Sequence, residues 1–453
     1  MKIYNTLSGQ KEDFVPGGEE VKMYVCGVTP YDSCHIGHAM SYIIFDMVRR
    51  YLAFSGYKVK YVQNFTDIDD KIIARANERG ISTRDMADEF IKEYFEDMDA
   101  LNIMRADVYP YATEMVPDII HVVQTLIEKG FAYELDGDVY FRVQKADNYG
   151  KLSGRNPDDL RAGSRIEVCE AKEYALDFAI WKAAKPGEPR WESPWGMGRP
   201  GWHIECSVMS QKYLGNTLDI HGGGQDLVFP HHENEIAQSE AYTGTIPFVK
   251  YWMHNGLLQM DQEKMSKSLG NLVTVKELRQ QVSADALRLF VLSSHYRSPL
   301  TFSDEGLAAM ERGADRLIRA VQLEENEGNG TPLDAEPYRQ RFTAAMDDDF
   351  NSAQAVATLF DLAREINKAG EEGAQIVGAQ NTLRELAGVL GLKLEAIQKE
   401  FAAGPFVDLL VDIRTQLRTA KQFQLSDVIR DRLTELGIAL EDSPQGTKWR
   451  QER

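Results

Sequence analysis

The sequence predicts an α/β protein with a doubly wound parallel sheet, an insertion, a helical bundle and a small C-terminal module. Two observations carry this prediction. A strand, a helix and a second strand follow one another between residues 21 and 62, and helical periodicity dominates the chain after residue 275. Parallel strands joined by a helix are typical of doubly wound sheets, in which ligands bind at the carboxyl ends of the strands.

The first strand–helix–strand unit follows from hydrophobic periodicity. The alternation of Val21, Met23 and Val25 with other residues predicts a strand, and Val59, Tyr61 and Val62 begin a second one after Gly56. Between them, apolar residues recur at helical spacing. These residues are Met40, Ile43, Ile44, Met47, Val48, Tyr51 and Leu52.

The later segments follow from composition and periodicity. Residues 69–103 have helical periodicity, residues 139–143 resemble a strand, and strand and loop patterning is expected to resume at Trp202–Cys206. The predicted division of the chain is a split sheet domain at 1–115 and 200–245, a connective insertion at 116–199, a region with a lysine-rich loop at 246–320, a helical bundle at 321–400 and a C-terminal module at 401–453.

Length, charge and cysteine content exclude several classes of protein. A chain of 453 residues with 43% hydrophobic and 27% charged residues has ample material for several folded domains. A net charge of −19 argues against broad, non-specific nucleic-acid binding. Four cysteines without a C-x-x-C pair exclude a disulfide framework and a compact zinc finger. No apolar stretch approaches the ~18 residues of a membrane helix and no secretory signal is recognisable, so we expect a cytoplasmic protein without a membrane partner.

Two short motifs are candidates for phosphate chemistry. His35-Ile36-Gly37-His38 falls at the predicted strand-to-helix turn, where backbone N–H groups and the helix dipole bind phosphate. Taken alone, these residues fit a polar helix cap equally well. The second motif, Lys264-Met265-Ser266-Lys267-Ser268, is predicted to be a loop whose two ammonium groups can close over a triphosphate and stabilise a leaving pyrophosphate. Taken alone, it fits a solvated lysine-rich turn better.

Both motifs in this order are the signature of class I aminoacyl-tRNA synthetases, and the chain resembles the cysteinyl-tRNA synthetases over nearly its full length. The segments that carry the resemblance are Met23–Gly27, Tyr31–Cys34, Asn64–Asp70, Gly201–Ser207, His221–Leu227, Phe229–Glu235 and Glu441–Trp449. The resemblance implies a Rossmann-like catalytic domain and an ATP-dependent cysteine–tRNA ligase. Its substrates would be L-cysteine, ATP with Mg²⁺, and cysteine tRNA, and the family expectation is a monomer. The residues it assigns to catalysis on the phosphates are His35, His38, Lys264 and Lys267.

A zinc site is expected near the substrate thiol. His231 and Glu235 are four residues apart, so on a helix they face the same side and can bind one ion. Cys26 and Cys206 could complete a site suited to zinc, but spacing alone leaves open that they are buried small hydrophobes. The resemblance implies that Cys26, Cys206, His231 and Glu235 are the zinc ligands. Because zinc favours a deprotonated thiol over the hydroxyl of serine, we expect direct sulfur–zinc contact and no editing domain.

Further site residues are implied by the resemblance. The positions that match the family's cysteine pocket are Gly27, Thr66, Trp202 and His221. The positions assigned to the ATP site are Gly37, Gly222, Gly223, Gly224, Asp226 and Lys267. Glycines permit close backbone approach to the adenosine, and the carboxylate can accept hydrogen bonds from ribose hydroxyls. Read alone, the three consecutive glycines more often form a tight turn, and the acids at 67–70 are expected at a helix N-terminus.

The C-terminal residues resemble the small module that recognises the anticodon. The candidate phosphate contacts are Arg414, Arg418, Lys421, Arg430, Arg432 and Lys448, and Trp449 is a candidate stacking platform. Residue by residue, the favoured interpretation is a solvated helical face and a core tryptophan.

Two alternatives remain, one within the same family and one from a different functional class. A ligase that joins cysteine to an amino-sugar, as in mycothiol synthesis, would share the zinc and nucleotide motifs but lack the C-terminal module. A non-catalytic synthetase-like protein that binds tRNA would have lost an active-site motif, and the sequence retains them all.

Overall fold

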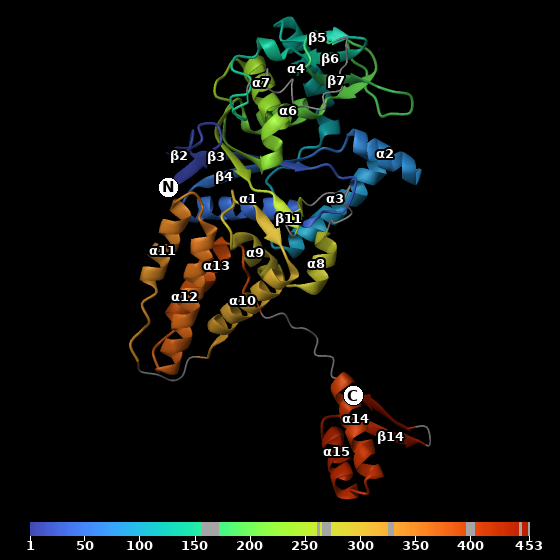
Figure 1. The fold of residues 1–453 in the computed structure, drawn as a ribbon, viewed down its shortest axis with the longest axis vertical. Coiled ribbons are helices and arrows are strands. Elements are labelled where there is room, and N and C mark those ends of the chain that lie inside the picture. The colour runs from blue at the N-terminus through green and yellow to red at the C-terminus, as the bar shows by residue number, and fades with distance from the viewer. Residues whose placement is uncertain are drawn as a thin grey trace. The chain divides into compact units, whose positions relative to one another are not determined.

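The computed structural model describes residues 1–155, 172–260, 263–264, 273–324, 330–395, 404–443 and 446–451. The chain forms two compact units, unit 1 (Met1–Glu395) and unit 2 (Ala396–Arg453) (Figure 1). Among the helices of the described residues, none has the length and apolar character needed to cross a bilayer.

Four parallel strands form the central sheet of unit 1, in the order β10-β9-β3-β4. Their bounds are Glu20–Val28 for β3, Lys58–Phe65 for β4, Leu218–Gly224 for β9 and Val249–Asn255 for β10. Both strands predicted near the start of the chain are confirmed, as β3 and β4. β3 has a parallel neighbour on each side, and its run from Met23 to Cys26 is buried without a break, as is usual in parallel sheets, whose two faces are both covered.

Helix α1 (Ile36–Phe54) connects β3 to β4 and packs against β4 and β9. The apolar positions predicted for this helix, from Met40 to Leu52, are all buried. Gly56, with φ +90°, follows the helix end and turns the chain into β4. The N-terminus of α1 therefore lies just beyond the carboxyl end of β3, which is where a doubly wound sheet binds its ligands.

Helices α2 (Asp70–Arg79) and α3 (Thr83–Ala100) follow β4. Asp69 caps α2 by accepting a hydrogen bond from the Lys71 N–H at 2.9 Å, which is the role expected of this acidic cluster. Its neighbour Asp67 instead accepts a hydrogen bond from the Thr113 N–H.

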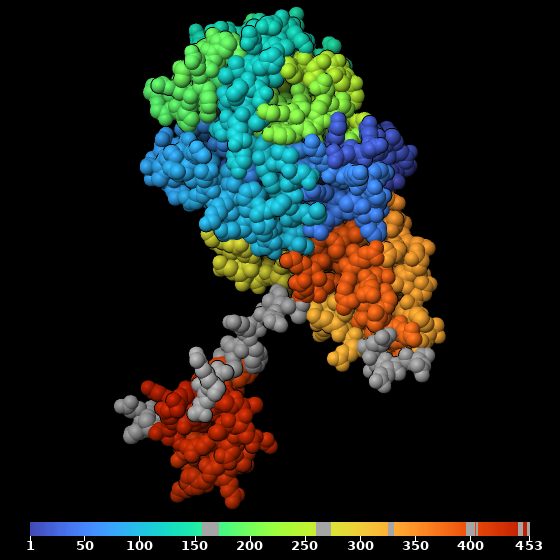
Figure 2. Space-filling view, turned by 180° about the vertical axis from the view of Figure 1, so that it is seen from behind, coloured from blue at the N-terminus to red at the C-terminus, as the bar shows by residue number. Residues whose placement is uncertain are grey.

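In its described residues, the insertion forms an antiparallel sheet and contains helix α4. Its helix α4 (Val116–Glu128) is preceded by the short turn η1 (Ala112–Met115). The strands, in the order β5-β6-β7-β8, span Ala132–Leu135, Asp138–Phe141, Phe178–Ala183 and Gly198–Pro200, with a 3₁₀ turn η2 at Val143–Lys145. The predicted strand at 139–143 is confirmed as β6. Within unit 1, the insertion (teal and green in Figure 2) lies at the opposite end from the orange helices of the bundle.

The prediction of a strand at Trp202–Cys206 is wrong, because these residues begin helix α6 (Trp202–Leu214). Every residue from Ile204 to Ser210 is buried, so the helix presents no continuous polar face and its sequence shows no helical period. After β9 come two short turns, η3 (Gln225–Leu227) and η4 (Val228–His232), and then helix α7 (Glu233–Thr243), which packs against α6.

The remainder of unit 1 is a small sheet and a helical bundle. The sheet has the order β12-β11-β13, with bounds Glu263–Lys264, Leu258–Met260 and Leu300–Phe302, and β1 (Lys2–Asn5) pairs with β2 (Gln10–Asp13) near the N-terminus. The helices are α8 (Val275–Gln281), α9 (Ala284–Leu292), α10 (Asp304–Gln322), α11 (Glu336–Asp347), α12 (Ser352–Glu371) and α13 (Val377–Val389).

A fully buried arginine joins the sheet layer to the bundle. Arg288 of α9 donates to Asp46 of α1 at 2.6 Å, to the Leu390 carbonyl at 2.9 Å and to the Leu101 carbonyl at 3.1 Å. One side chain thus holds three separate segments of unit 1 together.

Unit 2 contains helices α14 (Gly404–Thr419) and α15 (Phe423–Glu435) and a hairpin of β14 (Ile438–Ser443) and β15 (Gly446–Gln451). The hairpin was not expected from the sequence.

Arg414 is fully buried and donates two hydrogen bonds to Asp442, at 2.8 and 2.7 Å, so it is not available as a phosphate contact. Arg418 and Arg430 pair with the same carboxylate. Trp449 donates to Asp408 at 2.7 Å.

Candidate active site

Four buried side chains bring possible metal ligands together at the end of the central sheet. One ligand atom from each of Cys26, His231, His232 and Glu235 lies within 4.8 Å of the others. His231 Nε2 lies 3.1 Å from Glu235 Oε1, so the expected approach of these two residues on one helical side is confirmed. Cys206 of α6 lies beside this group, with its sulfur 3.9 Å from that of Cys26. Three of the four predicted ligands therefore belong to this group, the fourth, Cys206, contacts Cys26, and His232 is a member that the sequence analysis did not assign.

The separations suit a tetrahedral zinc ion. Bond lengths of about 2.0–2.3 Å give ligand–ligand edges of about 3.3–3.8 Å. The sulfur of Cys26 is 3.3 Å from His232 Nε2, 3.9 Å from Glu235 Oε1 and 3.9 Å from Cys206 Sγ. With the 3.1 Å contact of His231 and Glu235, three of the distances join members of the predicted set of four ligands, and each of these three lies within about 0.3 Å of that range.

Cys26 is directed into this group by an irregularity in the sheet. The register of β3 against β4 shifts between Val25 and Val28. At Gly27, a Cβ atom would lie 1.6 Å from the carbonyl oxygen of Asn64, so no other residue fits. The Gly27 N–H donates to Asn64 Oδ1 at 2.9 Å, and the same oxygen is 3.9 Å from the Cys206 sulfur. Asn64 thus links β3, β4 and α6, a role that no spacing in the sequence indicates.

The predicted cysteine-pocket residues surround the same group. His221 Nε2 lies 3.0 Å from Glu235 Oε2, and the His221 ring stacks on Trp252 at 4.5 Å. Trp202, the first residue of α6, stacks on the ring of His231 with centroids 4.3 Å apart. Thr66 accepts a hydrogen bond from Asn64 Nδ2 at 3.1 Å.

Two further histidines contact the outer ring nitrogens of the cluster, and the sequence analysis assigned neither of them. His203 Nδ1 is 2.9 Å from His231 Nδ1, and His254 Nε2 is 2.7 Å from His232 Nδ1. His254 in turn contacts the Thr6 hydroxyl at 2.8 Å through its Nδ1. Partners of this kind fix the ring orientation and tautomer of a metal-binding histidine. His203 stands three residues before Cys206, but nothing in the sequence links His254 to this site.

Burial controls protonation within the cluster. It raises the pKa of the Cys26 thiol well above its ordinary value, and Cys206 and Glu235 add to the effect. Burial also lowers the pKa of His231 and His232 well below the ordinary value, and that of His203 to about 3. A divalent cation would oppose the effect of burial on the thiol, because its charge favours the thiolate, and it would act with burial in keeping the histidines neutral, which is the form that binds a metal. The donor set and its environment therefore fit a bound zinc ion.

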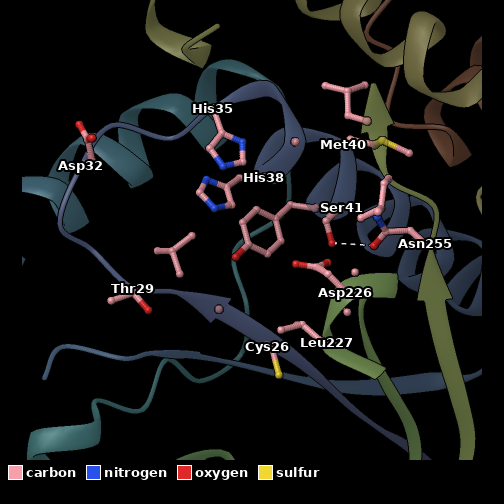
Figure 3. A pocket seen from close by; sticks show the side chains of 18 of the residues that line it. Cys26, Thr29, Asp32, His35, His38, Met40, Ser41, Asp226, Leu227 and Asn255 are labelled. Atoms are coloured by element: carbon pink, nitrogen blue, oxygen red, sulfur yellow. Dashed lines mark hydrogen bonds between the residues drawn. The ribbon is translucent and has the colours of Figure 1, made fainter. Parts of the chain in front are cut away.

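A cavity of about 360 Å³ begins at Cys26 and extends to the N-terminus of α1 (Figure 3). His35 and His38 lie on one side of it, with their rings stacked at 3.7 Å. His35 is the residue that precedes α1, and the Ile36 N–H donates to the Val273 carbonyl at 3.0 Å. The cavity therefore adjoins both the possible metal ligands and a helix N-terminus suited to phosphate.

The predicted ATP residues lie at different distances from this cavity. Gly37, Gly223, Gly224 and Asp226 line it. Gly222 instead packs on α1, where an added Cβ would lie 2.3 Å from the Phe45 ring. The backbone of Lys264 lies in β12, paired with Gln259, whereas its side chain and the whole of Lys267 lie outside the described residues.

Two family models match the chain. Residues 14–312 match the catalytic domain of class I tRNA synthetases of the (C) type, and residues 341–395 match the DALR domain. The first match contains the sheet, the insertion and the cavity. The second contains most of α11 together with α12 and α13.

The chain is similar to full-length curated proteins. It is 58% identical to the cysteine–tRNA ligase of Dehalococcoides mccartyi strain BAV1, with 99% of each chain covered. It is 51% identical to the cysteine–tRNA ligase of Carboxydothermus hydrogenoformans, over 99% of this chain and all of that one. Among solved structures, methionyl-tRNA synthetase of Mycobacterium tuberculosis, in complex with methionyl-adenylate, covers 87% of this chain and 94% of its own at 16% identity, with a TM-score of 0.61. That likeness shows a shared fold.

Proposed function

The chain belongs to the cysteine–tRNA ligase family, and from that premise we propose that it joins L-cysteine to tRNA in two steps. The cysteine carboxylate attacks the α-phosphate of ATP, which forms cysteinyl-adenylate and releases pyrophosphate. A hydroxyl of the terminal adenosine of tRNA then attacks the activated carbonyl, and AMP leaves. Neither step requires a protein nucleophile, so the chain contributes positioning and electrostatic stabilisation.

The observation that supports this proposal best is the shared cavity of about 360 Å³. Cys26 lines it at one side, and His35, Gly37 and His38 line it at the other. A thiol-binding group and a phosphate-binding helix terminus thus open into one space. Cysteine with its sulfur held near Cys26 would direct its carboxylate toward the α1 terminus, where ATP has to lie for the first step.

Cys26, Cys206, His231 and Glu235 are the proposed zinc ligands, with His232 directly beside them. A bound zinc ion would supply the positive charge that selects a thiolate over the serine hydroxyl. The surrounding residues orient these ligands. His221 contacts Glu235, and His203 contacts His231.

The phosphate and adenosine contacts extend the proposal. His35 and His38 lie where the α1 dipole and backbone N–H groups favour the negative charge of ATP. Gly223 and Gly224 line the cavity with no side chain, and the exposed Asp226 carboxylate is available to accept ribose hydroxyls. The roles of Lys264 and Lys267 in stabilising pyrophosphate remain predictions from the sequence.

For the acceptor we propose cysteine tRNA rather than an amino-sugar. The C-terminal unit with its own helices and hairpin favours the larger acceptor, because a small sugar requires no second unit. A cytoplasmic location, a monomeric state and recognition of the anticodon by unit 2 are parts of the same proposal.

Charging of cysteine tRNA with labelled cysteine tests this function, with serine as the matched control. We expect ATP-dependent charging with cysteine alone, and loss of that charging in Cys206→Ser. Exchange between pyrophosphate and ATP driven by cysteine, without charging of tRNA, would contradict the proposed acceptor and favour an amino-sugar. Binding of tRNA without exchange would contradict catalysis altogether.

A further inference from the structure

Glu233 directs its carboxylate toward the insertion rather than toward its own helix. It is the first residue of α7 and is only 1% exposed. Its Oε1 accepts a hydrogen bond from the Gly150 N–H at 2.9 Å, and its Oε2 accepts from the Leu152 and Ser153 N–H groups at 3.1 and 2.9 Å. A buried carboxylate is stable only with such partners, and three N–H groups in one turn form a cradle for an anion.

Residues 149–153, which we name the clamp loop, make two more contacts with α7. The Tyr149 hydroxyl donates to Asn234 Oδ1 at 2.5 Å, and Lys151 Nζ lies 2.6 Å from Glu240 Oε2. Gly150 has φ +97°, a conformation that other residues rarely adopt, and it lets the loop direct its N–H groups at one point. The clamp loop therefore holds the first two turns of α7 through three separate side chains.

The residues held by the clamp loop are next to the proposed zinc ligands. Glu233 follows His231 and His232 directly, and Glu235 is two residues further on. The turn that carries the two histidines is irregular, since Phe229 within it has extended backbone angles of −139° and 132°. Helical hydrogen bonds alone do not fix such a turn, so its position depends on contacts from outside.

We propose that Glu233 is a positioning residue, through which the clamp loop of the insertion fixes the turn that carries His231, His232 and Glu235. This inference rests on the proposed zinc site and extends it. It assigns the insertion a part in binding the substrate thiol, although none of its residues is a proposed ligand.

Glu233→Gln is the variant that tests the proposal. Glutamine preserves the shape of the side chain, but it replaces one accepting oxygen with an NH₂ group facing backbone N–H donors. We expect zinc affinity to fall by about 10- to 100-fold, as for other residues that orient metal ligands. KM for cysteine in pyrophosphate exchange should rise, whereas KM for ATP should remain unchanged, because the α1 terminus is not held by this loop.

The matched control is Glu240→Gln, which lies on the same helix and removes the charge that pairs with Lys151 of the clamp loop, but leaves the Glu233 cradle intact. It should keep the wild-type zinc affinity and KM for cysteine. Zinc affinity is measured by competition with a chromophoric chelator, and folding is checked by circular dichroism. If Glu233→Gln does not fold, Glu233→Asp replaces it, because it keeps the charge but shortens the side chain that reaches the three N–H groups, and we expect a smaller effect in the same direction.

Wild-type zinc affinity and KM for cysteine in a folded Glu233→Gln would overturn the inference. Equal losses in Glu233→Gln and Glu240→Gln would also overturn it, since they would indicate general loosening of α7. A wild-type protein that binds no zinc would instead overturn the proposed zinc site itself, so the two failures are distinguishable.

Discussion

Separate replacement of Cys206 and His232 tests which side chain completes the proposed zinc site. Both lie next to Cys26, the cysteine sulfur at 3.9 Å and the histidine Nε2 at 3.3 Å. We predict that Cys206→Ser weakens zinc binding far more than His232→Gln. Serine is a poor zinc ligand, and Cys206 is almost completely buried, so no water ligand can easily replace the lost thiolate.

The expected magnitudes follow from the proposed role of each residue. Structural zinc binds with about 10–16 kcal/mol, so one of four ligands contributes about 2.5–4 kcal/mol, equivalent to about 10²- to 10³-fold in affinity. The Nδ1 of His232 is 2.7 Å from His254, which is itself tied to Thr6, so this ring is held in place independently of zinc. Residues that only orient metal ligands contribute about 10- to 100-fold to metal affinity, and for His232 we expect a loss of about tenfold in zinc affinity.

The assay is competition for zinc between the protein and a chromophoric chelator at one fixed pH. Cys26→Ser serves as the positive control, because Cys26 belongs to either possible set of ligands. A greater loss of affinity in His232→Gln than in Cys206→Ser would refute the assignment. The four ligands would then be Cys26, His231, His232 and Glu235.

Three further predictions concern the scaffold around the site. Gly27→Ala should reduce cysteine-dependent pyrophosphate exchange by about 10²-fold. The new Cβ would lie 1.6 Å from the Asn64 carbonyl oxygen and would have to displace it, and an ~1 Å displacement at an active site has effects of this size. Unchanged exchange would contradict the close approach of the two strands. Arg288→Met should lower the free energy of unfolding by about 3 kcal/mol in urea titrations, because the buried Asp46 keeps only Arg50 as a cationic partner and two buried carbonyls lose their donor. The exposed Arg84→Met should change it by no more than ~0.5 kcal/mol. Burial raises the pKa of Asp97 from 3.8 to about 6, so its contribution to stability is present below about pH 4 and is lost as the pH rises through 6. The stability of Asp97→Asn relative to wild type should therefore increase by about 2–3 kcal/mol between pH 4 and pH 7, and a difference that does not change with pH would contradict this reasoning.

Local sequence patterns determined the first strand–helix–strand unit of the sheet domain. The alternation at Val21–Val25 and the helical spacing from Met40 to Leu52 predicted β3 and α1 correctly, because each of these elements has a distinct buried pattern. The approach of His231 to Glu235 also followed from the sequence, since residues four apart meet within one helical turn. The helix α6 was missed because its buried residues surround the helix and leave no period to detect.

The tertiary structure decided which distant residues meet. Arg414 looked like a phosphate contact among other basic residues, but Asp442 neutralises it in the interior of unit 2. Nothing in the spacing of His254 and Asn64 links them to the cluster, yet His254 contacts His232, and Asn64 Oδ1 lies 3.9 Å from the Cys206 sulfur. Sequence patterns report the periodic burial of one element at a time. Contacts between elements depend on how the strands and helices pack, and a single sequence carries no periodic signal for them.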